Sequence, residues 1–112
     1  MKLAAAALIV AVSGPAFAAG SDGRWSVLVI TERGSCDVYR WELILQNGRI
    51  LPSANLPVQP SGGVSQRGRV AIRFVRGGEA LSATGSLRGA YGAGTWSAPT
   101  RGCSGRWRAE RR

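Results

Sequence analysis

Apolar and polar residues alternate along most of this chain with the period of two that is typical of β-strands. The clearest example is CDVYRWELILQ, where every second residue from Tyr39 to Leu45 is apolar and the residues between them are mostly polar. The pair Asn47–Gly48 follows directly and indicates a hairpin, because both residues tolerate the positive φ angles of a type I′ turn. Residues 49–53 (RILPS) are therefore predicted to form the return strand.

The same alternation recurs at short intervals through the rest of the chain. Turn signals separate the segments at Gly34, near Gly68 and at Gly77–Gly78. The segments with strand character are 24–31, 36–46, 49–53, 64–75, 80–89, 90–98 and 104–112. Because the turn near Gly68 divides one of them, the chain holds about eight short strands, and no helical period follows the first residues. This pattern predicts an all-β fold, a small antiparallel barrel or barrel-like sandwich of about six to eight strands.

One segment, LPVQPSGG at 56–63, has the composition of a connector rather than of a strand. Pro52, Pro57 and Pro60 remove backbone donors, which places this part of the chain at a sheet edge or in a surface loop. The loop from Leu51 to Gly63 is expected to be the most variable element. A plain connector is favoured over a recognition loop, because no recognition motif occurs in it.

The first residues have the features of a secretory signal peptide. Lys2 gives a positive start, an apolar run follows at 3–12, and Ala-Phe-Ala at 16–18 is a small-x-small cleavage site. The apolar run is about half as long as a membrane span. Cleavage after residue 18 would leave 19–112 as a single exported domain, periplasmic or secreted, without a membrane span.

The two cysteines, Cys36 and Cys103, both lie in this predicted mature domain. In an oxidising compartment such a pair usually forms a disulfide. A zinc site and a redox pair are the alternatives, but the chain has no histidine and no Cys-x-x-Cys motif. We therefore predict a Cys36–Cys103 bridge. It would close a loop of about 67 residues and stabilise the fold by about 4 kcal/mol.

Three of the four tryptophans follow a glycine by two residues, at 23–25, 94–96 and 105–107. A glycine at that spacing lies on the same strand face as the tryptophan, where it leaves room for an indole from the adjacent strand or permits a bend. If the first and last strands pair to close a barrel, the three tryptophans are predicted to cluster at one end. The predicted core consists of the aromatic residues Trp25, Tyr39, Trp41, Phe74, Trp96 and Trp107 and the aliphatic residues Leu43, Leu45, Val70, Ile72, Leu81 and Leu87.

The segment Gly23-Arg24-Trp25 resembles the start of lipocalins and of avidin-like barrels. In lipocalins a Gly-x-Trp opens the first strand, and an arginine of the last strand packs over the indole. The resemblance implies that Arg106, Arg108 or Arg111 contacts Trp25. It covers only the two ends of the chain, and the short strands argue against a deep ligand cup.

A second resemblance covers most of the predicted mature chain. The segments DGRWSVLVITERGSCDVYRWEL, GSLRGAYGAGTWSA and CSGRWRAERR are similar to a group of small exported proteins of Gram-negative alphaproteobacteria. Their shared pattern is a DGxW opening, an early cysteine, a GxGxW segment and a closing CxGxWxAxR. The resemblance implies the fold, export and the disulfide, and it implies no activity because none is established for that group.

The chain is strongly basic, with 15 Lys and Arg against 6 Asp and Glu and a formal net charge of +9. Lys2 is the only lysine, so arginine carries all the positive charge of the predicted mature domain. Planar guanidinium groups bind phosphate and carboxylate bidentately. The candidate anion-binding residues, on predicted outward faces or turns, are Arg40, Arg73, Arg76, Arg88, Arg106 and Arg108. An arginine surface that serves only solubility is the alternative.

Catalysis is not expected from this composition. No histidine is present to act as a general base or metal ligand, and no lysine follows the signal peptide to form a Schiff base. The six acids are scattered along the chain, and the glycine-rich segment at 89–94 precedes no helix whose N-terminus would bind a phosphate. We predict no catalytic residues, no metal site and no cofactor.

These observations predict a small exported, non-catalytic binding or structural module with an arginine-rich surface that recognises an anionic envelope polymer such as lipopolysaccharide. One alternative is a protein–protein interaction or inhibitor-type module whose partner is an acidic protein, because a cationic partner would be repelled. Another is a calycin-type carrier of a small apolar ligand. Nucleic acid matches the charge but is not expected, since export removes it as a target and the aromatic residues fall on apolar faces.

Overall fold

A computed structural model of the chain describes residues 19–52 and 58–112. The predicted signal peptide, 1–18, lies outside the described residues. The described elements are η1 (Ala19–Ser21), β1 (Gly23–Arg33), β2 (Tyr39–Gln46), β3 (Arg49–Ile50), β4 (Gln59–Val64), β5 (Arg69–Arg76), β6 (Glu79–Arg88), β7 (Tyr91–Ala98), η2 (Pro99–Arg101) and β8 (Cys103–Arg111). The predicted all-β class is confirmed.

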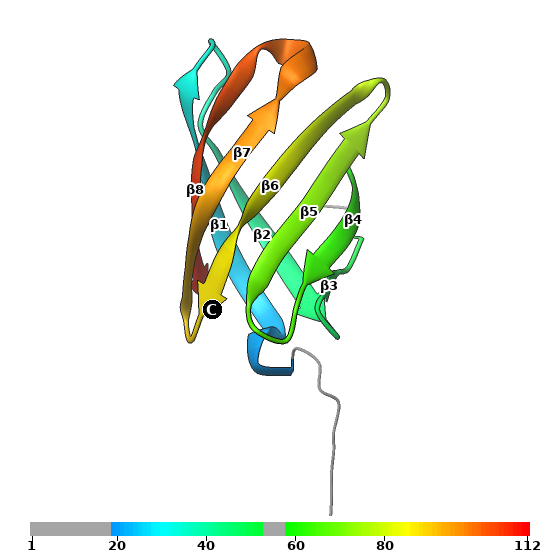
Figure 1. Cartoon of the computed structure of the whole chain (residues 1–112), viewed down its shortest axis with the longest axis vertical. Coiled ribbons are helices and arrows are strands. Elements are labelled where there is room, and N and C mark those ends of the chain that lie inside the picture. The colour runs from blue at the N-terminus through cyan, green and yellow to red at the C-terminus, as the bar shows by residue number, and fades with distance from the viewer. Residues whose placement is uncertain (1–18, 53–57) are drawn as a thin grey trace, which may run out of the picture.

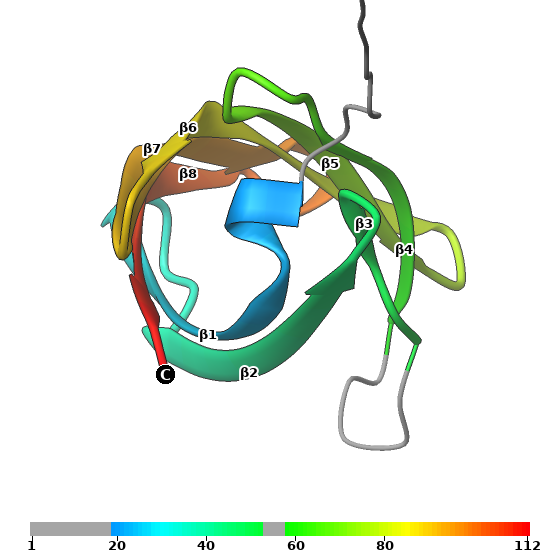
Figure 2. The same cartoon turned by 90° about the horizontal axis from the view of Figure 1, so that it is seen from below.

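The eight strands form one antiparallel sheet that curls into a nearly closed barrel (Figures 1 and 2). The strand order is β3-β2-β1-β8-β7-β6-β5-β4, so the first long strand and the last one pair with each other. Their register runs from Trp25 opposite Arg111 to Arg33 opposite Ser104. The two ends of the sheet meet where the Val64 N–H donates to the Gly48 carbonyl at 2.7 Å. This pairing confirms the barrel rather than the sandwich.

Strand β4 corrects the interpretation of the proline-rich segment as a plain connector. Residues 59–64 pair with β5, from Gln59 opposite Val75 to Val64 opposite Val70. Pro60 is tolerated because β4 is an edge strand of the sheet, where a missing donor leaves no ladder bond unmade. The predicted return strand is shorter than expected, since only Arg49–Ile50 pairs with β2 and Ser53 lies outside the described residues.

The barrel has two different ends. The closed end carries η1, which lies across the opening in Figure 2, together with the β2–β3 hairpin, the β4–β5 turn and the β6–β7 hairpin. The opposite end, called the mouth, carries the β1–β2 loop, the β5–β6 hairpin and η2 (Figure 1). Strands that follow each other in the chain are neighbours in the sheet, apart from β3 and β4. Their short connections therefore form the two ends of the barrel.

The barrel interior is apolar, and the tryptophans fill it. Trp25, Trp96 and Trp107 are only 2%, 4% and 5% exposed. The predicted clustering of these rings at one end is wrong. Trp25 lies opposite Arg111 near the closed end, Trp107 opposite Val29 halfway along, and Trp96 opposite Gly105 closer to the mouth. The three indoles therefore fill successive levels of one core.

The predicted core residues at the mouth are less buried than expected. Phe74 is 6% exposed, whereas Tyr39, Trp41, Ile72 and Leu81 are only partly buried against the core. For Tyr39 and Trp41 the reason is local: β3 has two residues, so the mouth half of β2 has no paired strand on that side among the described residues. The other predicted aliphatic core residues, Leu43, Leu45, Val70 and Leu87, are buried.

Gly94, which precedes Trp96 by two residues, makes room for an indole from the adjacent strand, as the spacing suggested. A Cβ at Gly94 would lie 2.7 Å from the Cε2 atom of Trp107 and 2.7 Å from the Cα atom of Gly85. Gly85 is also in contact with this ring, since its Cβ would meet Trp107 Cζ2 at 2.7 Å. The indole thus lies over two adjacent glycine positions of β6 and β7, and its N–H donates to the Thr84 carbonyl at 3.0 Å.

Arg111 is the arginine that packs on the first tryptophan. Its guanidinium carbon lies 4.8 Å from the Trp25 ring centroid, and its Nη atoms donate to the carbonyls of Asp22 and Gly20. The Trp25 N–H donates to the Ser21 carbonyl at 2.8 Å. These contacts fix η1 across the closed end. The other two arginines named for this role, Arg106 and Arg108, are exposed on the outer face of β8.

Replacing Arg111 with alanine is expected to lower the free energy of unfolding by about 1–3 kcal/mol. The change removes the cation from the indole face and leaves carbonyl groups near η1 without their donor. Urea denaturation followed by tryptophan fluorescence measures the effect, with Arg111→Lys as the matched variant. Lysine keeps the charge without the planar fork and should give an intermediate loss. Wild-type stability of the alanine variant would contradict the assigned role.

Candidate functional site

The mouth holds a cleft of about 640 Å³. Its apolar lining comes from side chains of four strands, among them Trp41, Phe74, Leu81 and Trp96. Trp41 and Phe74 pack edge to face with ring centroids 5.2 Å apart, and Tyr39 lies beside Trp41 at 6.2 Å. Partly exposed aromatic rings at the opening of a barrel provide an apolar surface that solvent reaches.

The cleft continues into the barrel as a smaller apolar cavity of about 60 Å³. Trp41, Phe74, Leu81 and Trp96 line both spaces. This inner cavity is narrow along its whole length, because Trp107, Trp25 and the aliphatic core residues line it as well, so the space does not form a deep cup. Space large enough for a small molecule is therefore found at the mouth and not in the barrel interior.

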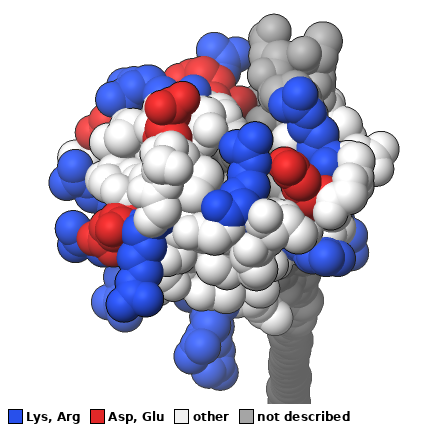
Figure 3. Space-filling model, turned by 90° about the horizontal axis from the view of Figure 1, so that it is seen from above, with Lys and Arg blue, Asp and Glu red and all other residues white. Residues whose placement is uncertain are grey.

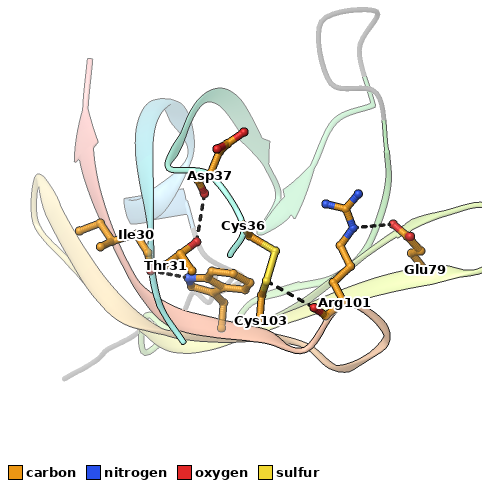
Figure 4. Close-up of a disulfide and its surroundings, with 8 residues drawn as sticks. Ile30, Thr31, Cys36, Asp37, Glu79, Arg101 and Cys103 are labelled. Atoms are coloured by element: carbon orange, nitrogen blue, oxygen red, sulfur yellow. Dashed lines mark hydrogen bonds and ion pairs between the residues drawn. A yellow bond between two sulfur atoms is a disulfide. The ribbon is translucent and has the colours of Figure 1, made fainter. Parts of the chain in front are cut away.

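The predicted disulfide is confirmed at the rim of this cleft. Cys36 and Cys103 are bonded with Cα atoms 6.2 Å apart and a sequence separation of 67. The bridge ties the β1–β2 loop to the start of β8 (Figure 4). A second tie holds the same loop, because the Thr31 hydroxyl donates to the Asp37 carbonyl at 3.0 Å.

Three charged side chains line the cleft, and two of them neutralise each other. Arg101 Nε lies 3.1 Å from Glu79 Oε1, next to the disulfide in Figure 4. Arg76 also lines the cleft, and it forms no ion pair within the described residues. Along β5 it has the same parity as the inward residues Val70 and Phe74. Figure 3, which looks onto the mouth end, shows acidic and basic side chains intermixed around uncharged surface.

The six candidate anion-binding arginines do not form one face. Arg40, Arg106 and Arg108 lie on β2 and β8, on either side of β1, and the other three lie on β5 and β6. Arg73 pairs in register with Ser82, whereas Arg88 is further along β6 by a distance of roughly 20 Å. Arg106 is bound to Glu32 at 2.7 Å. A continuous surface built from these six residues is therefore absent.

A tighter arginine group occurs at the closed end, and only one member was predicted. Arg69 pairs with Ser86, so Arg88 is its diagonal neighbour on the outer face at about 7–8 Å. Arg67 lies in the adjoining turn, which contacts β6 through a 2.7 Å bond from the Leu87 N–H to the Gly68 carbonyl. Tyr91, opposite Arg88 on β7, is 65% exposed. We call Arg67, Arg69, Arg88 and Tyr91 the closed-end cluster.

The closed-end cluster is held in place and is free of acidic partners within the described residues. The Ser65 hydroxyl accepts from the backbone N–H groups of Arg67 and Arg69 at 3.2 and 3.1 Å, which fixes the turn. Glu110, opposite Tyr91 on β8, instead lies 3.8 Å from Arg112. None of the three arginines forms an ion pair in the described part of the chain.

Clustered metal ligands and membrane-spanning helices are both absent from the described residues. In the ranges 19–52 and 58–112, no three His, Cys, Asp or Glu side chains gather closely enough to hold a metal ion. No described helix is long and apolar enough to cross a membrane.

Comparisons with protein-family models, with curated proteins and with solved structures find no match to the chain. The resemblance to small exported alphaproteobacterial proteins therefore stays a prediction. The barrel and its disulfide rest on strand pairing and on the Cys36–Cys103 bond.

Proposed function

We propose that this protein is a non-catalytic binding module that attaches to an anionic polymer through the closed-end cluster. The observation that carries the proposal is the convergence of Arg67, Arg69 and Arg88 on neighbouring elements, where none of them has a carboxylate partner in the described part of the chain. Such guanidinium groups keep their donors available for phosphate or carboxylate. The net positive charge of the chain attracts a polyanion toward the surface, and the cluster then supplies the contacts.

Tyr91 suggests which kind of polymer fits. Its exposed ring stands beside Arg88 and offers a flat apolar face next to the cations. A sugar ring that carries phosphate or carboxylate groups matches both features, and lipopolysaccharide presents such sugars. The predicted export would place the protein in the periplasm or the medium, where this polymer occurs, and the disulfide is consistent with an oxidising compartment.

Replacing Arg67, Arg69 and Arg88 together with glutamine is expected to weaken binding to immobilised lipopolysaccharide by about ten- to hundredfold. Each lost contact between an exposed arginine and an anion contributes up to about 1 kcal/mol. The experiment measures the salt concentration at which the protein elutes. The matched control replaces Arg40, Arg73 and Arg108 with glutamine, which removes the same charge from other parts of the barrel.

The two triple variants distinguish binding at the closed-end cluster from binding that depends only on the net positive charge. The control variant should elute close to the wild type if the closed-end cluster is the site. Equal losses in both variants would show that only net charge matters, and the proposal would then be wrong. Retention of the wild type on an acidic envelope protein through high salt, with none on lipopolysaccharide, would favour the protein-interaction alternative. Stronger retention on single-stranded DNA than on lipopolysaccharide would also contradict the proposed target.

A further inference from the structure

The mouth cleft lies at the opposite end of the barrel from the closed-end cluster, and polymer binding does not use it. We propose that this cleft binds a small organic monoanion with a ring-sized apolar body. The apolar body would lie on Trp41, Phe74 and Leu81, and the anionic group would meet Arg76. This site is independent of the proposed polymer-binding function.

The volume and lining of the cleft fit a small organic molecule. At about 640 Å³ it is in the usual range for small-molecule sites, which extend over about 300–1,000 Å³. The Trp96 N–H is already bound to the Ile30 carbonyl at 3.0 Å, so this ring offers the ligand an apolar surface rather than a free donor. Contact with the partly exposed rings of Tyr39 and Trp41 would remove apolar surface from water.

The charges of the lining select an anion with one charge. Glu79 lies 3.1 Å from Arg101 and stands opposite Arg76 in the β5–β6 hairpin, so the two arginines and one glutamate that line the cleft leave one excess positive charge. A guanidinium at the edge of an apolar surface binds a carboxylate, sulfonate or phosphate group that projects from an apolar body. A neutral ligand of the same shape would leave this cation unused.

The filled lower barrel limits the length of the apolar body. The continuation below the cleft holds only about 60 Å³, because the buried rings of Trp107 and Trp25 that line it leave little free space. A long extended chain therefore has no channel to enter, whereas one or two fused rings fit the wide upper space. This shape distinguishes the site from a deep cup for an extended apolar ligand.

Two fluorescent probes that differ only in charge test the proposal. Anilinonaphthalene sulfonate carries one anionic group, and N-phenylnaphthylamine is the same aromatic body without it. We expect the intact protein to bind one sulfonate probe per chain, and to bind the neutral probe about five- to tenfold more weakly. Arg76→Gln should remove this preference by weakening the sulfonate probe alone. Arg73→Gln, on the outer face of the same strand, is the matched control and should preserve the preference.

A third variant tests the position of the apolar body. Leu81→Trp should fill the cleft and weaken both probes together, with near-ultraviolet circular dichroism as the check that the barrel is intact. If this variant does not fold, the ratio of the affinities of Arg76→Gln for the two probes tests the proposal by itself. Absence of binding, equal affinity of the wild type for both probes, or equal effects of Arg76→Gln and Arg73→Gln would overturn the proposal. The closed-end triple variant should bind both probes like the wild type, which separates this site from the polymer site.

Discussion

Gly94→Ala is expected to lower the free energy of unfolding by about 3 kcal/mol or more. The added methyl group would collide with the backbone of β6 at Thr84 and Gly85, and with the Trp107 ring at 2.7 Å. Backbone cannot yield as a flexible side chain does, so β6 and β7 would have to separate or the indole would have to leave its place. Urea denaturation followed by tryptophan fluorescence measures the loss.

Gly78→Ala is the matched control for this prediction. Gly78 lies in the β5–β6 hairpin, and a Cβ built there meets no atom within 4 Å. The control should stay within about 0.5 kcal/mol of the wild type, as surface substitutions usually do. A loss below about 1 kcal/mol for Gly94→Ala would mean that the strands accommodate a side chain there, and the packing role of the glycine would be wrong.

Removal of the disulfide is expected to lower the free energy of unfolding by about 4 kcal/mol, because the bridge spans 67 residues and restricts the unfolded chain. For a domain of this size, that corresponds to a fall in Tm of about 15–30 °C. Cys36→Ala with Cys103→Ala is the suitable variant, since Cys103 is 4% exposed and a hydroxyl there would be buried. Thermal unfolding by circular dichroism measures the change.

Reductant supplies the internal control for the disulfide. The wild type should unfold at a lower temperature when reduced, whereas the double alanine variant should not respond to reductant. If the Tm of the wild type did not change in reductant, with free thiols verified by labelling, the disulfide would not contribute to stability and the prediction would be wrong.

The long strands could be predicted because their residues alternate in a way that only a half-buried strand explains. The run from Tyr39 to Leu45 and the segment at 69–75 gave both the strand and the inward face. Strand β4 could not be predicted in this way. Its sequence QPSGGV has no apolar alternation, and it is a strand because β5 offers it a ladder of backbone partners. Tertiary context decides such edge strands more than propensity does.

The candidate sites were harder to predict because they depend on distances across strands. Alternation indicates that Arg73 and Arg88 face outward, but it does not show how far apart register places them. Arg67 and Arg69 join Arg88 only because the β4–β5 turn lies against the end of β6. Likewise, Arg76 lies two residues after Phe74 and therefore faces the same side of β5. That this side opens into a cleft at Arg76 could not be predicted, because the cleft exists only in the closed barrel.

The pairing of β1 with β8 also sets the order in which the molecule can assemble. The two strands are neighbours at the middle of the sheet, yet they lie at opposite ends of the described chain. A polypeptide that emerges from its N-terminus presents β1 together with its first partner, β2, long before its second partner, β8, exists. Pairings of such high sequence separation form slowly, because loop closure must precede the contacts that stabilise it. The barrel therefore completes only after its last strand has emerged, and until then β1 has β2 as its paired neighbour while its other edge waits for β8.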